Sequence, residues 1–127
     1  MKEVMAIVRQ NKVNMTKEAL AEAGFPAFTC RKVLGRGRKL IDMNLLRSIV
    51  EAGDVPATAQ GEYLTEGSRL IPKRVFTVIV DDKDLEQVVN VFMEVNSAGN
   101  PGDGKIFVLP LMENYRVRNG EMTIEAY

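Results

Sequence analysis

The chain has 127 residues, 46% of them hydrophobic, which is enough for one domain, 1–127, with a substantial core. Its 17 Lys and Arg residues balance 17 Asp and Glu residues, so no net charge draws it to nucleic acid or a membrane surface. Histidine is absent and Cys30 is the single cysteine, which removes the commonest metal ligand and excludes an internal disulfide. No run approaches the ~18 apolar residues of a membrane span. We therefore expect a cytoplasmic protein without a metal site of its own.

The first third of the chain predicts a strand, a helix and a second strand. Residues 4–9 open with an apolar run typical of a buried strand. A helical segment follows, with Asn14 or Thr16 as its expected N-cap and Gly24 at its C-terminal end. We expect the second strand within 25–34.

The second half of the chain predicts a third strand, a second helix and a fourth strand. Residues 75–80, V-F-T-V-I-V, form a strongly β-prone strand, and Asp82 is placed to cap a helix. A fourth strand is expected over 105–109, after a break at 97–101. In the helix between them, one apolar stripe is formed by Leu85, Val88, Val89 and Phe92. The order predicts an α+β fold of the ferredoxin-like βαββαβ type, with an antiparallel sheet and both helices on one face.

A long insert, 36–72, separates the second and third strands and exceeds ordinary loop lengths. Within it an apolar stripe has helical spacing, which requires something to cover it. Either the stripe folds back on the chain's own sheet, or it is a partner-binding element that orders on contact. The stripe consists of Ile41, Leu45, Leu46, Ile49 and Val50.

A second motif predicts an anion site. Gly102 and Gly104 flank Asp103 and let backbone N–H groups approach an anion closely, and Lys105 adds a positive charge. Two further cations, Arg116 and Arg118, are two residues apart and would point the same way on an extended strand. The pattern favours a polyphosphate-binding site in which Asp103 shapes the turn. The alternative is that these residues form an ordinary turn into a strand in a purely structural protein.

Several motifs together resemble the PII signalling family. They are G-F-P-A-F-T at 24–29, G-R-G-R at 35–38, P-K at 72–73, G-D-G-K-I-F at 102–107 and R-V-R-N-G-E at 116–121. The resemblance runs nearly end to end, and only the long insert differs in length. Its I-P-K-R segment at 71–74 is most similar to the second paralogue of the NifI branch, which is encoded beside nitrogenase genes.

The resemblance implies a homotrimer with three nucleotide clefts between neighbouring copies, each holding ATP or ADP. It also implies 2-oxoglutarate bound beside Mg-ATP at the base of the long loop, called the T-loop in this family. Positions around adenine and ribose correspond to Ile7, Thr29, Gly35 and Ile79. Positions at the phosphates correspond to Gly37, Arg38, Gly102, Asp103, Gly104, Lys105, Arg116 and Arg118.

One departure concerns the 2-oxoglutarate site. Lys73 matches the lysine that pairs with a 2-oxoglutarate carboxylate, and Gly37 lies nearby in the family site. After Arg38, however, the family usually has a glutamine that helps to ligate Mg, whereas this chain has Lys39. An ammonium group cannot ligate a cation, so Lys39 would instead contact phosphate or 2-oxoglutarate, or lie in solvent.

The function implied is that of a non-enzymatic nitrogen-regulatory sensor. The resembled branch acts with its paralogue on nitrogenase, so nitrogenase is the expected target and a hetero-oligomer with a PII-like paralogue is a second assembly to consider. Alternatives are a PII protein for an ammonium channel or biosynthetic enzyme, and a sensor of adenylates alone. An ATP-consuming enzyme is disfavoured because the chain has no histidine and no paired nucleophile and base.

Overall fold

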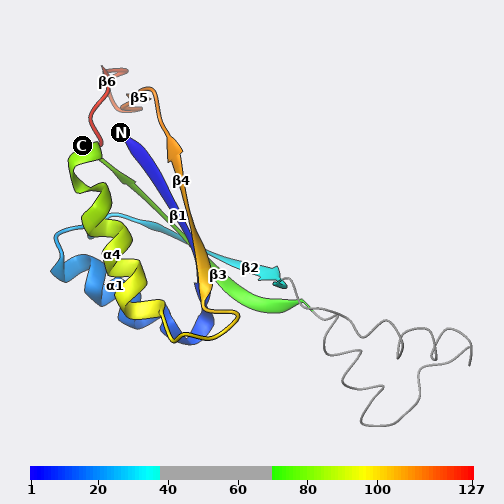
Figure 1. The fold of residues 1–127 in the computed structure, drawn as a ribbon. Helices are drawn as coiled ribbons and strands as arrows, with labels where there is room; N and C mark the ends of the chain where they lie inside the picture. The colour runs from blue at the N-terminus through cyan, green and yellow to red at the C-terminus, as the bar shows by residue number, and fades with distance from the viewer. Residues whose placement is uncertain (38–69) are drawn as a thin grey trace, which may run out of the picture. The chain divides into compact units, whose positions relative to one another are not determined.

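The structure is a computed structural model that describes residues 1–37 and 70–127 (Figure 1). The chain divides into two units, Met1–Val33 with Pro72–Tyr127 and Leu34–Ile71. Of the described elements, the first unit holds two α-helices and most of the sheet. The expected insert, 36–72, belongs almost entirely to the second unit, and its residues 38–69 lie outside the described part of the chain.

Four strands form one sheet in the order β2-β3-β1-β4. They are β1 (Lys2–Arg9), β2 (Thr29–Gly35), β3 (Ile71–Val80) and β4 (Gly104–Pro110). The central strand, β1, pairs antiparallel with β3 on one side and with β4 on the other. The expected ferredoxin-like βαββαβ order is confirmed, with each predicted strand present and the boundaries shifted by a few residues.

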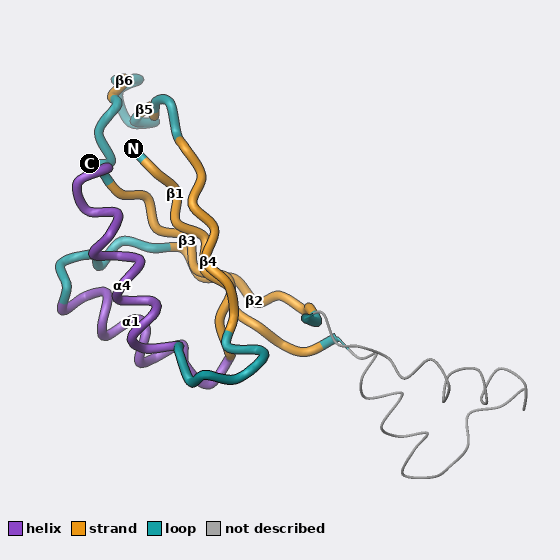
Figure 2. The backbone as a smooth tube through the Cα atoms, viewed as in Figure 1, coloured by secondary structure: helices purple, strands orange, loops and turns teal. Residues whose placement is uncertain are grey.

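Two helices, α1 (Val13–Glu22) and α4 (Leu85–Asn96), lie side by side on one face of this sheet (Figure 2). Each is preceded by a 3-10 turn, η1 (Gln10–Lys12) before α1 and η2 (Asp82–Asp84) before α4. After β4 the chain forms a small hairpin from β5 (Asn114–Tyr115) and β6 (Met122–Thr123). Within the described ranges, neither helix has the length and apolar character needed to cross a membrane.

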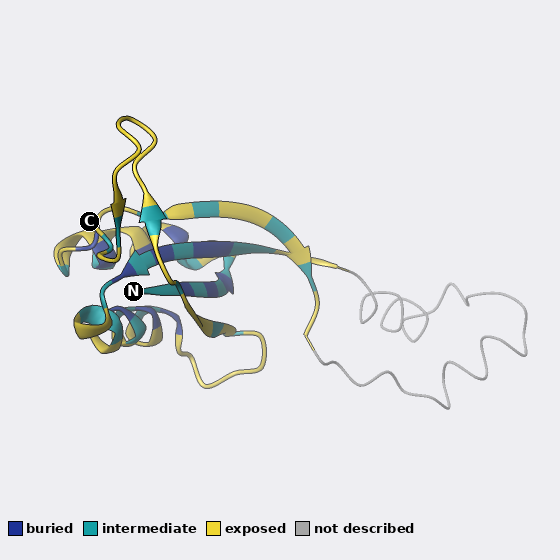
Figure 3. Ribbon diagram, turned by 90° about the horizontal axis from the view of Figure 1, so that it is seen from above, coloured by how far each residue is buried: buried dark blue, intermediate teal, exposed yellow. Residues whose placement is uncertain are grey.

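The hydrophobic core lies between the helices and the sheet (Figure 3). Three residues of the predicted α4 stripe face it, since Val88 and Phe92 are buried and Leu85 packs against the core. Phe76 of β3 packs edge-on against Phe92 with ring centres 5.8 Å apart. Alternate residues of β1 also point into the core. The buried hydrophobic residues are Val4, Ala6, Val8, Val13, Leu20, Phe25, Val75, Phe76, Val78, Val80, Val88 and Phe92.

Both predicted N-caps are wrong, whereas Gly24 follows the C-terminal end of α1 as expected, with a φ of +93°. The helix α1 begins at Val13, and Thr16 is a buried residue inside it whose hydroxyl donates to the carbonyl of Lys12 at 2.7 Å. The carboxylate of Asp82 accepts a hydrogen bond from the amino group of Met1 at 3.0 Å, and α4 begins only at Leu85. In both places a 3-10 turn precedes the helix. The polar side chain bonds elsewhere, and Thr16 also accepts a hydrogen bond from Nδ2 of Asn96 on α4 at 3.2 Å.

The face of the sheet opposite the helices carries apolar side chains. Met5 of β1 is in register with Phe107 of β4, and Glu3 is in register with Leu109. The side chains of Phe107 and Leu109 are 42% and 37% exposed. An apolar sheet face of this kind ordinarily packs against another layer.

A close approach of two strands depends on Gly104, the first residue of β4. Its φ is +118°, and a Cβ added there would lie 1.9 Å from the carbonyl oxygen of Ile7 on β1. Only a residue without a side chain fits this position.

We therefore predict that Gly104→Ala lowers the free energy of unfolding by about 2–5 kcal/mol, because backbone strain and a clash with β1 add. Urea unfolding monitored by circular dichroism measures this loss. Gly99→Ala is the matched control, since Gly99 also has a positive φ, +75°, but its Cβ would meet nothing within 4 Å. That control is expected to cost about 1 kcal/mol, and equal losses in the two variants would contradict the role of the β1 contact.

Candidate anion-binding site

The loop from α4 to β4, residues 97–103 and here called the anion loop, is held together by the carboxylate of Asp103. One carboxylate oxygen, Oδ2, accepts hydrogen bonds from the backbone N–H of Ala98 at 2.7 Å and of Asn100 at 3.2 Å. Gly102, beside Asp103, has a positive φ of +94°. The carboxylate of Asp103 thus points inward to the loop backbone, in agreement with its expected role in shaping the turn.

Two cations at one end of the sheet also contact the anion loop. The guanidinium Nη2 of Arg9 donates to the carbonyl of Pro101 at 3.0 Å and lies 3.5 Å from Oδ1 of Asp103. The ammonium of Lys73 donates to the carbonyl of Gly102 at 2.7 Å. Arg9 and Lys73 are directly opposite each other on β1 and β3, so two like charges meet beside a loop that supplies their acceptors.

This arrangement shifts two ionisation equilibria. The N–H of Ala98, with smaller contributions from Asn100 and Arg9, holds the pKa of the Asp103 carboxyl below its ordinary value, against the opposing effect of burial. Partial burial, and then the neighbouring charge of Arg9, lower the pKa of Lys73, while Asp103 opposes the shift. The site thus keeps the carboxyl group of Asp103 ionised, and the ammonium group of Lys73 loses its proton more readily than that of a surface lysine.

Sequence reasoning missed Arg9. Its loop partner Pro101 is 92 positions away in the chain, and no local pattern connects them. The available signal was indirect: Arg9 ends the predicted first strand, beside the start of the third strand in a ferredoxin-like sheet.

The strand register separates the residues predicted to bind the nucleotide, together with Lys73 of the predicted 2-oxoglutarate site, into two groups. At one end of the sheet, Ile7 is in register with Lys105, next to the anion loop. At the other end, Glu3 is in register with both Ile79 and Leu109. Four residues of extended strand span about 13 Å, so one chain does not bring the two ends together.

We name these groups by their place. The loop-end group consists of Ile7, Lys73, Gly102, Asp103, Gly104 and Lys105. The hairpin-end group consists of Thr29, Ile79, Arg116 and Arg118. The two arginines belong to it because their hairpin follows the end of β4, and Thr29 because it is the first residue of β2, at the end of that strand away from the insert. Within one chain, Lys105 therefore does not converge with the two arginines.

The expected strand carrying both arginines is also wrong. Arg116 and Arg118 lie in the turn between β5 and β6, closed by a hydrogen bond from the N–H of Gly120 to the carbonyl of Arg116 at 2.7 Å. The guanidinium of Arg116 pairs with the carboxylate of Glu121 at 3.4 Å. A polar turn rather than a continuous strand sets the direction of these cations.

The remaining predicted residues stand apart from both groups. Gly35, the last residue of β2, and Gly37 belong to the second unit of the chain. Arg38, Lys39 and the whole stripe at 41–50 lie outside the described residues, so the phosphate, 2-oxoglutarate and partner roles assigned to them stay predictions.

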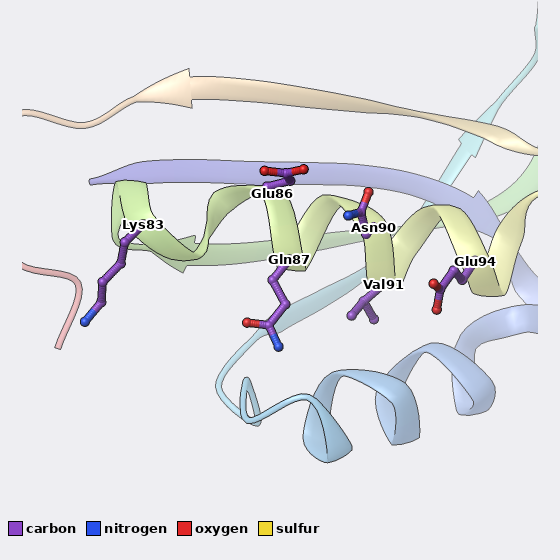
Figure 4. Close-up of a pocket in the computed structure, with 6 residues that line it drawn as sticks. All are labelled: Lys83, Glu86, Gln87, Asn90, Val91 and Glu94. Atoms are coloured by element: carbon purple, nitrogen blue, oxygen red, sulfur yellow. The ribbon is translucent and has the colours of Figure 1, made fainter.

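Two surface hollows are present in the described part of the chain. One, of about 310 Å³, lies where the end of α4 meets the start of β4, and its lining includes Ile7, Asn96, Asp103, Gly104 and Lys105. The other, of about 450 Å³, lies along α4, where its charged and amide side chains project (Figure 4). It is lined by Lys83, Glu86, Gln87, Asn90, Val91 and Glu94 and includes none of the predicted site residues.

Comparison with known proteins identifies the family. Residues 1–121 match the family described as nitrogen regulatory protein P-II. The chain is 45% identical over 129 aligned residues to "nitrogen fixation nifHD region GlnB-like protein 2" of Methanobacterium ivanovii, covering 99% of this chain and 98% of that protein. It is 39% identical over 127 residues to the protein of the same name from Methanothermobacter marburgensis, with 99% of each covered.

A protein named "nitrogen fixation nifHD region GlnB-like protein 1", from Methanothermococcus thermolithotrophicus, is 34% identical over 124 residues, covering 98% of this chain and 100% of that protein. The higher identity to the proteins named "2" agrees with the expected second-paralogue branch. Fold, sequence motifs and relatives lead to one conclusion: the chain belongs to the nitrogen regulatory P-II family, in its NifI-like branch.

Proposed function

We propose that the protein is a cytoplasmic nitrogen-regulatory sensor, not an enzyme, that binds ATP or ADP in clefts formed between neighbouring copies. The observation that carries this proposal is the separation of the loop-end group from the hairpin-end group along one sheet. Loop-end residues of one copy and hairpin-end residues of its neighbour would together surround one nucleotide. Such a cleft uses both groups without moving either of them within its own chain.

The chemistry of the two groups suits a nucleotide. The anion loop and Lys105 supply backbone N–H groups and a charge for the phosphates, while Ile7 supplies an apolar surface. From the neighbour, Arg118 would add a guanidinium, which pairs with phosphate in two-point geometry.

Assembly into a homotrimer follows from the same proposal. The apolar side chains of Phe107 and Leu109 on the sheet face opposite the helices are exposed in the single chain. Burying that face against two further copies would remove this surface from water and would also bring opposite sheet ends together.

Control of nitrogenase is the regulatory part of the proposal. The relatives with the highest quoted identities have names that place them in a nitrogen-fixation gene region. The protein would act by contact of its long T-loop with the target, alone or in a hetero-oligomer with a paralogue. Ligands at the loop base would bias the loop between two states, and their influence extends only as far as their differential affinity for those states.

Binding of 2-oxoglutarate with Mg would require a change in the contacts of Lys73. Lys73 is present and contacts the anion loop, so a carboxylate binding Lys73 would have to replace the carbonyl of Gly102. Lys39 replaces the usual Mg-ligating glutamine, which favours the alternative of a sensor of adenylates alone.

For the assembly, we predict that Phe107→Asp dissociates the trimer, because burying an unpaired carboxylate in an apolar interface costs several kcal/mol. Light scattering after size-exclusion chromatography should give three times the 14.1 kDa chain mass for the wild type and a lower mass for the variant. Met93→Asp, at an exposed position of α4, is the control and should stay trimeric. A monomeric wild type would refute the shared-cleft proposal.

For the ligands, we predict saturable ATP binding in calorimetry that weakens about tenfold or more in Lys105→Met, since a charge-assisted hydrogen bond is lost. Lys17→Met, on the exposed face of α1, should bind as the wild type does. Titrating 2-oxoglutarate into the ATP complex, with and without Mg, then tests the second ligand. Mg-dependent binding supports a carbon and nitrogen sensor, whereas ATP binding without any 2-oxoglutarate response supports the adenylate sensor.

For the target, we predict that Leu45→Asp with Ile49→Asp abolishes nitrogenase binding in a pull-down while ATP affinity is retained, because charges interrupt the apolar stripe. The matched control is Leu45→Met with Ile49→Val, which keeps the stripe apolar. Retained target binding by the Asp variant would remove the stripe from the contact surface.

A further inference from the structure

We propose that Arg9 and Asp103 form a positioning pair for the anion loop: together they fix its backbone for phosphate binding, and neither contacts phosphate itself. This inference rests on the proposed nucleotide function, which it deepens by assigning two residues a role distinct from charge attraction. It also extends the turn-shaping role expected for Asp103, by giving that residue a partner in Arg9, and it removes Asp103 from the residues expected to contact phosphate.

The carboxylate of Asp103 is already committed to the loop. Its Oδ2 accepts from the N–H groups of Ala98 and Asn100, and its own N–H donates to the carbonyl of Asn100 at 3.3 Å. The side chain is only 20% exposed. An ionised carboxylate turned inward, with its oxygens occupied or buried, cannot bind a phosphate and would repel one that came close.

The other carboxylate oxygen depends on Arg9. Oδ1 of Asp103 is buried and has no hydrogen-bond partner among residues 1–37 and 70–127, and the guanidinium of Arg9 lies 3.5 Å from it. The same guanidinium nitrogen, Nη2, donates to the carbonyl of Pro101. One nitrogen of Arg9 therefore contacts the two residues that flank Gly102, at the carbonyl of Pro101 and at the carboxylate of Asp103.

Gly102 makes room for this contact. A Cβ at Gly102 would lie 3.2 Å from Nη2 of Arg9, and its φ of +94° disfavours any side chain. The sheet thus contributes the guanidinium of Arg9, and Gly102 leaves the space that this group occupies. Asp103 links the two, because one of its oxygens accepts hydrogen bonds from the loop backbone and the other faces Arg9. Loss of Arg9 leaves a buried carboxylate oxygen without its counter-charge, which destabilises this conformation of the loop.

Simple electrostatics and positioning make opposite predictions for Asp103→Asn. If the charges near the loop act only through attraction, removing a negative charge tightens ATP binding. If Asp103 positions the loop, Asn weakens ATP binding, because the N–H groups of Ala98 and Asn100 lose a charged acceptor. The sign of the change therefore distinguishes the two roles.

The experiment measures ATP affinity by calorimetry for the full-length wild type, Arg9→Met, Asp103→Asn and the double variant. We expect each single variant to bind ATP about tenfold more weakly, and the double variant to lose little more, because both changes release the same loop. Lys17→Met, which removes one positive charge from the exposed side of α1, should bind ATP as the wild type does. Tighter ATP binding in Asp103→Asn, or fully additive losses, would overturn the pair.

A second measurement needs no ligand. We expect hydrogen exchange at the amides of Ala98 and Asn100 to accelerate in both single variants, while the amide of Ser97, bonded to the carbonyl of Met93 at the end of α4, keeps its rate. Unchanged exchange in both variants would refute the positioning role. A wild type that binds no ATP would refute the proposed function, and the exchange data would still decide whether the pair shapes the loop.

Discussion

The antiparallel pairing of β1 with both of its neighbours is the constraint on which the rest of the structure depends. Because β1 is hydrogen-bonded to β3 and β4 in one fixed register, each residue of one strand fixes the place of two others. A slip of one residue would turn Val4, Ala6 and Val8 from the core to the opposite face. The core and the two ends of the candidate site are therefore set by the same interaction.

Like charges directly opposite in a sheet are ordinarily destabilising, and Arg9 opposite Lys73 is such a pair. The anion loop offsets this repulsion, since Pro101 and Gly102 offer their carbonyls and Asp103 offers its carboxylate. The loop and the cations thus stabilise each other. A polyanion approaching this end of the sheet meets cations whose repulsion is only partly neutralised, which is a favourable starting point for binding.

Much of the fold could be predicted because its signals are local. The apolar stripe of α4 and the β-prone run in β3 each specify an element within a few residues, and their order specifies the topology. The helix starts could not be predicted from capping preferences, because Thr16 and Asp82 hydrogen-bond to groups that their 3-10 turns and the tertiary fold bring close. Such hydrogen bonds outweigh the N-capping preferences of these residue types.

The candidate site was predictable in part for the same reason. Gly102, Asp103 and Gly104 form one short motif whose backbone conformation follows from its composition. Arg9 was missed because its loop contacts join distant parts of the chain. The direction of the two hairpin arginines was wrong because the exposed residues 116–121 between β5 and β6 form a turn, which has no periodicity to indicate it. Spacing predicts direction only within regular elements.

The separation of the two groups along the sheet has a genetic consequence for any ring in which neighbouring copies share a cleft. A chain defective at Lys105 and a chain defective at Arg118 each fail to complete a cleft with their own kind. A ring that contains both kinds of chain, however, has one cleft formed by an intact loop end and an intact hairpin end. Another cleft in the same ring is formed by the two defective ends. Two inactive alleles would therefore complement each other when expressed together, and in a ring with a paralogue the subunit composition would set the number of intact sites.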